Sequence, residues 1–175
     1  MARPPAFTQA RAALRYDDTS KRLILPLKYA DHTEAVKGLA ELMRRPGEVL
    51  LQAANLVVPV PLHVSRLRAR KFNQAALLAI ALARLTGRPL GVDALVRTRA
   101  TAPLEGMGRA ARQAELADAI TLRPGLDVTD KRVLVIDDVM TSGATANTCA
   151  KALLAAGARR VDVLTAARVA DQQYA

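Results

Sequence analysis

Hydrophobic and polar positions along the chain predict strands that alternate with helices. Three short runs rich in β-branched residues are typical of buried strands; they span residues 56–61, 132–136 and 161–166. Apolar residues recur at helical spacing in three longer segments, 33–45, 72–85 and 146–156. Gly87 and Gly157 follow two of these segments as helix stops. The order strand, helix, strand in the last third of the chain indicates a right-handed βαβ unit and therefore a parallel sheet.

The remaining segments have weaker patterns. Residues 11–16 alternate loosely and predict a short strand, and Asp17–Ser20 supplies caps for a helix over 21–29 that Pro26 kinks or interrupts. Residues 94–96 predict another strand, and the basic stretch that follows them gives no assignment. The pattern as a whole indicates one α/β domain without an internal boundary.

Composition narrows the class of protein. Hydrophobic residues make up 51% of the 175 residues, enough for an independent core, and no apolar run reaches the ~18 residues of a membrane span. The start of the chain has no apolar stretch typical of a secretory signal, so a cytoplasmic protein is expected. The one cysteine, Cys149, excludes a disulfide framework and a four-cysteine zinc site, and its position on an apolar helix face predicts a small core residue.

The net charge bears on the choice of partners. Lys and Arg number 26 against 16 Asp and Glu, which gives a formal charge of +10. Such a balance favours polyanions, either phosphorylated small molecules or nucleic acid, although an arginine-rich surface without such a partner is an equal alternative. Aromatic residues make up 3% of the chain and tryptophan is absent, which argues against a stacking platform for single-stranded nucleic acid.

The segment that carries chemistry is 133–145, where an apolar strand ends in two adjacent carboxylates, Asp137 and Asp138. Ligands bind at the carboxyl ends of the strands in open α/β sheets. The loop that follows is made of small and hydroxyl residues, Thr141, Ser142, Gly143, Ala144 and Thr145. Its N–H groups and the helix N-terminus together form a cradle for an anion. A ribose phosphate needs both parts, because its hydroxyls donate to carboxylates and its phosphate accepts from N–H groups.

Three other interpretations explain less. If Asp137 and Asp138 were simple helix caps, one acid would be explained but not both. A Walker phosphate loop ends in Gly-Lys-Ser or Gly-Lys-Thr, and no lysine lies between Lys131 and Lys151. Residues 106–111 match a dinucleotide-binding fingerprint by letters, but neither a preceding strand nor an acid for the ribose supports it.

These motifs resemble a known family. Residues 135–145 are similar to the signature with which type I phosphoribosyltransferases bind phosphoribosyl pyrophosphate (PRPP). Further stretches resemble one branch, the competence protein F (ComF) family, over nearly the whole chain; they are Arg11–Tyr16, Leu27–Tyr29, Val58–His63, Arg66–Arg70, Phe72–Gln74 and the segment with Arg97, Arg99 and Thr101. The resemblance implies a type I phosphoribosyltransferase fold, an α/β fold with a mostly parallel sheet flanked by helices and a small hood. It also implies one domain, with residues 1–50 as the hood and helical part and 51–175 as the PRPP-binding core.

The resemblance further implies a role for each candidate site residue. Asp137 and Asp138 would contact the ribose hydroxyls as the catalytic acids, and residues 141–145 would hold the 5-phosphate. A pyrophosphate loop would contain Arg66, Arg68, Arg70 and Lys71. A flap that closes over PRPP would contain Arg97, Arg99, Arg109 and Arg112. Mg²⁺ would enter with PRPP, without direct protein ligands. From the residues alone, a solvated basic turn stays open as an alternative for the pyrophosphate loop.

Three functions of different classes remain open. In the first, the protein is a phosphoribosyltransferase that passes the phosphoribosyl group of PRPP to an unidentified acceptor and releases pyrophosphate. In the second, it senses PRPP without transfer and serves DNA uptake in natural transformation, with single-stranded DNA as partner. In the third, it is a protein–protein module of a DNA-uptake machine and contacts a helicase. A homodimer is open in each case. Lys71, Leu104 and Glu115 depart from the family pattern in the two loops, so PRPP binding is a firmer prediction than turnover. The zinc module with which the family usually begins would end near Met1, so it is expected either to be lost or to lie outside this sequence.

Overall fold

The computed structural model describes residues 4–28, 33–62, 72–98 and 119–170. Their main element is a four-stranded sheet in the order β1-β6-β5-β2, made of β1 (Ala10–Arg15), β6 (Arg160–Arg168), β5 (Arg132–Met140) and β2 (Leu56–Pro59). All three neighbouring pairs are parallel. A separate antiparallel pair consists of β3 (Leu95–Arg97) and β4 (Ile120–Leu122). The parallel sheet predicted from the sequence is therefore confirmed.

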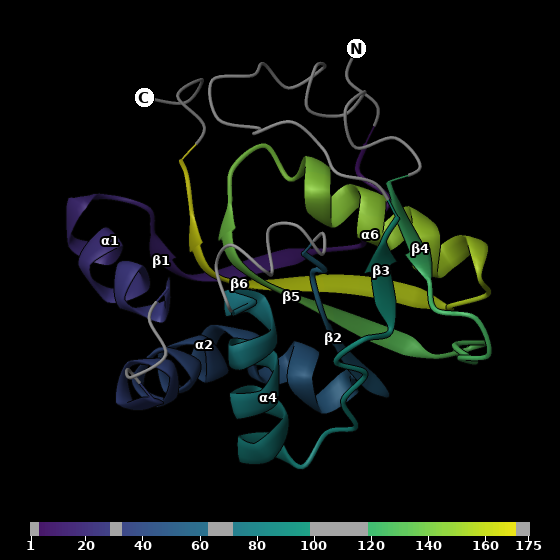
Figure 1. Ribbon diagram of the computed structural model, residues 1–175, viewed down its shortest axis with the longest axis horizontal. Coiled ribbons are helices and arrows are strands. Elements are labelled where there is room, and N and C mark those ends of the chain that lie inside the picture. Colours follow the sequence, from purple (N-terminus) through teal and green to yellow (C-terminus); the bar gives the residue numbers. More distant parts are fainter. Residues whose placement is uncertain (1–3, 29–32, 63–71, 99–118, 171–175) are drawn as a thin grey trace.

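Helices cover both faces of this sheet (Figure 1). On one face lie α2 (Thr33–Ala53) and α4 (Gln74–Thr86), and on the other lies α6 (Ala144–Ala155) with the β3–β4 pair. Between β1 and α2 the chain forms α1 (Asp18–Ile24) and the 3₁₀ helix η1 (Leu25–Lys28). The result is a three-layer α/β arrangement, in agreement with the fold class expected from the sequence.

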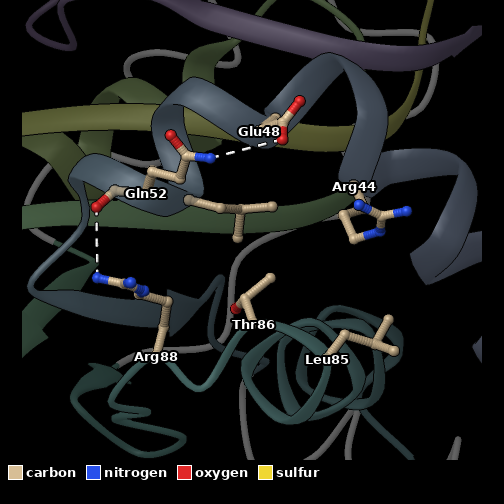
Figure 2. A pocket seen from close by; sticks show the side chains of 7 residues that line it. Arg44, Glu48, Gln52, Leu85, Thr86 and Arg88 are labelled. Atoms are coloured by element: carbon tan, nitrogen blue, oxygen red, sulfur yellow. Dashed lines mark hydrogen bonds between the residues drawn. The ribbon is translucent and has the colours of Figure 1, made fainter.

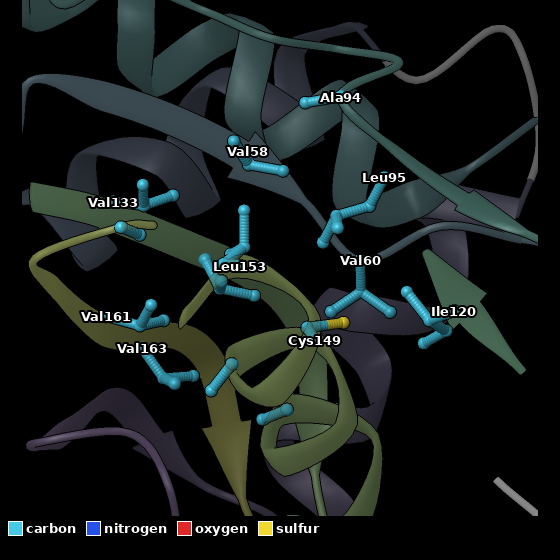
Figure 3. Packing of buried hydrophobic residues seen from close by; sticks show 14 of the residues in the cluster. Val58, Val60, Ala94, Leu95, Ile120, Val133, Cys149, Leu153, Val161 and Val163 are labelled. Carbon is cyan, nitrogen blue, oxygen red and sulfur yellow. The ribbon is translucent and has the colours of Figure 1, made fainter. Parts of the chain in front are cut away.

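The core is divided by the sheet into two clusters, because side chains alternate between the faces of a strand. Along β5, Val133 and Val135 belong to the cluster on the α6 side, whereas Leu134 and Ile136 belong to the cluster on the α2 and α4 side. Figure 3 shows the α6-side cluster, whose members include Val58, Leu95, Ile120, Cys149 and Leu153. Because β5 is buried on both faces, it requires the continuous apolar run from which it was predicted.

Two helices differ from the prediction. α2 ends at Ala53 and not at residue 45, although Pro46 lies inside it. Proline removes one hydrogen bond and faces solvent here, while Leu50 and Leu51 beyond it are buried and stabilise the continuation. The helix expected over 21–29 is instead the short α1 followed by η1, and Asp17 caps α1 as expected by accepting the backbone N–H of Ser20 at 2.8 Å.

The strands also differ in extent. β5 continues through both acids to Met140 instead of ending at residue 136. β4 was not predicted from the sequence. The division between hood and core at residue 50 stays a prediction. Residue 50 lies within α2, and β1, from the predicted hood part, belongs to the same sheet as β5.

Candidate functional site

β5 carries the two acids at its carboxyl end, between β6 and β2. In the register of the sheet, Asp137 lies beside Thr165 of β6, and the pairing continues to Met140. Asp137 is paired directly with β6, and Asp138 lies between the paired residues Asp137 and Val139. Each carboxylate also accepts the backbone N–H of the next residue: the N of Asp138 donates to Oδ1 of Asp137 at 2.9 Å, and the N of Val139 donates to Oδ1 of Asp138 at 2.7 Å. The sheet thus fixes the position of the pair.

The two carboxyl groups are close enough to influence each other. Burial of its carboxyl group raises the pKa of Asp137 well above the ordinary value, and the Asp138 carboxyl adds to this through its charge and a side-chain hydrogen bond. The backbone N–H of Asp138 and the charge of Arg97 act in the opposite direction on the pKa of Asp137. On α6, burial first and the charge of Asp137 second raise the pKa of the Cys149 thiol. Because its pKa is raised, Asp137 can hold a proton in the unliganded protein, so the charge at this position depends on what binds to it.

The loop after β5 turns sharply into α6. Thr141 is exposed, and Ser142 and Thr145 are half-buried. Gly143 precedes the helix with φ 74° and ψ 8°, the left-handed conformation. Glycine adopts this conformation without a steric penalty, so a glycine at this position suits the turn. The predicted loop and helix are confirmed as local structure, with the helix beginning two residues earlier than expected, at Ala144.

The loop and the first turn of α6 line a shallow hollow beside the acids. Asp137 contributes to its wall, and the other lining residues are Val139, Met140 and residues 141–146. The N-cap residue of α6 is Gly143, which has no side chain to cap the first turn, so the N–H groups of that turn can serve a ligand. The Ser142 hydroxyl is buried and has no hydrogen-bond partner within the described ranges. N–H and hydroxyl donors beside two carboxylates can bind an anion that also carries hydroxyl groups.

The N-terminal segment supports this loop, which the sequence did not reveal. The backbone N of Ala6 donates to Oδ1 of Asn147 on α6 at 2.7 Å. The Phe7 ring lies near the turn: a Cβ placed on Gly143 would be 3.8 Å from its Cζ atom. No local motif marks these contacts, because they join residues about 140 positions apart in the chain.

Arg97, which the sequence assigned to the flap, is the last residue of β3 and is only 6% exposed. Its flap role stays a prediction. Its charge acts on both Asp137 and Cys149, so its side chain lies within electrostatic reach of both groups. The reason is its strand position: Leu95 and Arg97 point inward, while Val96 between them is 40% exposed.

The other basic residues of the predicted site lie outside the described residues. These are the pyrophosphate-loop residues Arg66, Arg68, Arg70 and Lys71 and the flap residues Arg99, Arg109 and Arg112. Their roles stay predictions. The described chain resumes at Phe72, directly before α4.

The start of α4 adds two residues to which the sequence assigned no role. Asn73 caps the helix by accepting the N of Ala76 at 3.3 Å, and its Nδ2 donates to the Val60 carbonyl at 3.0 Å. It therefore ties the start of α4 to the end of β2. Gln74 is only 3% exposed, and its Nε2 has no hydrogen-bond partner within the described part of the chain. The Phe72–Gln74 motif had been noted only as a family resemblance.

A second hollow, of about 200 Å³, lies between α2 and α4 (Figure 2). Its lining residues are Arg44, Glu48, Leu51, Gln52, Leu85, Thr86 and Arg88. One guanidinium N–H of Arg88 donates to the carbonyl of Gln52 at 3.3 Å, shortly before β2 begins. This hollow is therefore at the opposite end of the parallel strands from the acids, and it shares no residue with the candidate site.

The fold and this strand–loop–helix site define a domain of the type I phosphoribosyltransferase kind. The family model described as "Phosphoribosyl transferase domain" matches residues 73–175, which include β5, the loop and α6. Among solved structures, the glutamine PRPP amidotransferase of B. subtilis, complexed with ADP and GMP, aligns with a TM-score of 0.53 and 22% identity. The alignment covers 80% of this chain and 30% of that one, and it shows a likeness of fold.

Relatives by sequence narrow the family. The DNA utilization protein YhgH of Escherichia coli K12 is 32% identical over 170 residues, which are 93% of this chain and 73% of that protein. Competence protein F of Haemophilus influenzae is 31% identical over 119 residues, which are 67% of this chain and 52% of that protein. The chain therefore belongs to the phosphoribosyl transferase domain family and, within it, to the ComF and YhgH group.

Proposed function

We propose that this protein binds PRPP at the carboxyl end of β5. The observation that carries the proposal is the continuity of the site: a buried strand places two acids next to a left-handed glycine turn, and a helix without a side-chain cap follows directly. The ribose hydroxyls would donate to Asp137 and Asp138, and the 5-phosphate would accept from the N–H groups of residues 141–145. The buried Ser142 hydroxyl would gain a hydrogen-bond partner in the bound state.

The transfer reaction that we propose follows from this arrangement. The bond between the ribose C1 and a pyrophosphate oxygen breaks, the leaving group keeps the electron pair, and a lone pair of the acceptor forms the new bond to C1. Positive charge that develops on the ring is stabilised by the nearby carboxylates, and the leaving pyrophosphate needs cations. We assign that need to Arg66, Arg68 and Arg70. The acceptor, and whether transfer occurs at all, are the parts of the proposal that binding alone does not decide.

Magnesium is expected to arrive with PRPP. Among the described residues, no group of three or more His, Cys, Asp or Glu side chains is arranged to hold a metal ion. The acids alone do not form a metal centre, so the ion would be held mainly by ligand oxygens and water and would neutralise pyrophosphate charge. Described helices are also too short or too polar to cross a membrane. We propose a cytoplasmic location, where PRPP is available.

The test is calorimetric titration of Mg²⁺ and PRPP into the protein, with ribose 5-phosphate and pyrophosphate as half-ligands. We expect PRPP to bind more tightly than either half, and the double variant Asp137→Asn, Asp138→Asn to lose this binding while it stays folded. Asp130→Asn is the matched control, because Asp130 precedes β5 at its opposite end and has φ 57°, a conformation that asparagine tolerates. Unchanged PRPP affinity in the double variant would refute the site.

A second function is favoured by the names of the relatives and by charge. One relative is described as a DNA utilization protein and another as a competence protein, and this chain has a formal charge of +10. We propose, as the alternative to transfer, a PRPP-sensing module that binds single-stranded DNA during DNA uptake, with a helicase partner. Competition separates the two: PRPP should displace DNA if the basic loop at 66–71 binds both. DNA affinity that is insensitive to PRPP and to neutralisation of that loop would exclude this site.

A further inference from the structure

Arg97 is a buried cation in a position that the flap interpretation does not explain. Its backbone pairs with Ile120 of β4, and the N of the next residue, Thr98, donates to the Ala119 carbonyl at 2.9 Å. Pairing with β4 therefore fixes the backbone of Arg97 and of the residue that follows it. Leu95, two residues earlier on the same face, packs in the core cluster that contains Cys149 (Figure 3). Arg97 therefore enters the same layer, closer to the end of β3.

The positive charge of Arg97 acts on two ionisable side chains, Asp137 and Cys149. It lowers the pKa of Asp137 on β5, and it also lowers the pKa of Cys149 on α6. Asp137 and Cys149 belong to different elements, so a charge that affects both lies between the β3–β4 pair, the sheet and α6. The thiol is fully buried and stays neutral, so it only reports the field. The group whose charge matters is Asp137.

We propose that Arg97 is a positioning residue which supplies the positive charge that lets Asp137 accept a hydrogen bond from the ribose hydroxyl of the ligand. This inference rests on the proposed function, since it assigns a cause to ribose recognition at the same site. In this role Arg97 acts through Asp137 and not through contact with the ligand, and its backbone is held by pairing with β4.

The physical reason is the opposition of charges in a buried place. A carboxyl group that is out of water and beside a second carboxyl favours its protonated form. A protonated Asp137 keeps fewer acceptor sites for a ribose hydroxyl than a carboxylate does. A fixed guanidinium is charged at every accessible pH, so it offsets both effects without titrating itself. Removal of one member of such a buried set leaves the others uncompensated.

Among the described residues, the side chains named around Asp137 come from β3, β5, β6 and α6. Asp138 lies on β5 itself, Arg97 comes from β3 and Cys149 comes from α6. On β6 the residue paired with Asp137 is Thr165, which does not titrate. Among the described residues that act on Asp137, Arg97 supplies a positive charge and Asp138 a negative one.

The test measures protons as well as affinity. PRPP with Mg²⁺ is titrated calorimetrically into wild type, Arg97→Gln, Arg97→Lys and Arg84→Gln between pH 5 and 9, in buffers of different ionisation enthalpy. Arg84 is the control for net charge, because it is exposed on the last turn of α4. In wild type, binding should release protons at the lower pH values and weaken as Asp137 becomes protonated. In Arg97→Gln, both effects should move to higher pH by about one unit, which is a tenfold change in proton affinity.

Arg97→Lys keeps the charge, so its proton release and PRPP affinity should stay close to those of wild type. Arg84→Gln should match wild type in both quantities. Identical proton release in Arg97→Gln and Arg84→Gln would overturn the proposal. If wild type binds no PRPP, the proposed function fails, and the coupling is still tested in the protein without ligand. There, Asp137→Asn should remove most of the pH dependence of stability that distinguishes Arg97→Gln from wild type. If Arg97→Gln does not fold, the double variant with Asp137→Asn should restore folding, and a double variant that is no more stable would refute the coupling.

Discussion

Gly143→Ala tests whether the left-handed turn before α6 is what shapes the proposed phosphate cradle. An alanine at φ 74° is strained, and the left-handed region costs an L-residue about 1–2 kcal/mol. The added Cβ meets no steric obstacle, because its nearest neighbours would be Sδ of Met140 at 3.7 Å and Cζ of Phe7 at 3.8 Å. The whole cost is therefore conformational. For a domain of this size, about 1 kcal/mol corresponds to a fall in Tm of about 2–4 °C.

The same helix-rich protein offers a matched control for this change. Gly38 lies inside α2, and a Cβ placed on it would have no neighbour within 4 Å. Gly38→Ala should therefore stabilise the protein by about 0.5–1 kcal/mol, since alanine is the better helix former. Gly143→Asn should cost less than Gly143→Ala, because asparagine adopts the left-handed conformation more readily.

The assay is urea unfolding followed by circular dichroism, together with PRPP affinity by calorimetry. If the loop of Gly143→Ala keeps its shape, the loss appears in the free energy of unfolding. If the loop relaxes, the loss appears in PRPP affinity, by up to about tenfold for 1.4 kcal/mol. The reasoning is refuted if Gly143→Ala matches Gly38→Ala in stability and also binds PRPP like wild type.

Two further predictions concern Asp137 and Asn73. Asp137→Asn should stabilise the unliganded protein at neutral pH: the pKa of Asp137 is raised on folding, so the stability due to its proton is complete below the ordinary aspartate pKa and is lost as pH rises through the folded-state value. Urea midpoints from pH 4 to 8 should diverge as pH increases, and parallel curves would contradict this. Asn73→Ala should cost about 1–2 kcal/mol, because it removes both the α4 cap and the hydrogen bond to the Val60 carbonyl. Asn73→Asp keeps the cap acceptor and should lie between the two in denaturant midpoint; equal stability of Asn73→Ala and wild type would show that neither bond matters.

The sequence predicted the main strands and helices from their local apolar patterns, but it did not predict where some of them end. The apolar run before Asp137 predicted a buried strand. Gly87 ends α4 in the left-handed conformation that is expected of a helix stop. The end of that strand was placed too early, because carboxylates normally mark a loop, whereas here the pairing with β6 includes Asp137, Val139 and Met140. The sequence placed the end of α2 at residue 45, whereas Leu50 and Leu51, which are buried beyond Pro46, extend the helix to Ala53. Gly47 shows the same tertiary control, since a Cβ there would collide with the Leu164 side chain.

The site was predictable where its residues are consecutive and unpredictable where they come together in space. Asp137–Thr145 form one continuous motif, and the structure brings them into one hollow. Arg97 looked like one more basic residue in a basic stretch, and only the alternation of β3, set by its pairing with β4, turns it inward. Asn147 and Phe7 support the loop from positions far apart in sequence, which no periodicity can reveal.

The position of β5 has a consequence for the entropy of ligand binding. Since β5 has a neighbour on each side and a core cluster on each face, it can separate from its surroundings only when the whole domain unfolds. The carboxylates of Asp137 and Asp138 are consequently preorganised, and a ligand would find them in place before it arrives. Within the proposed site, the residues between Met140 and Ala144 lie outside the strand and the helix, so a local ordering cost of binding would fall on them rather than on the carboxylates. Recognition of a sugar and of its phosphate would then differ in dynamics as well as in chemistry.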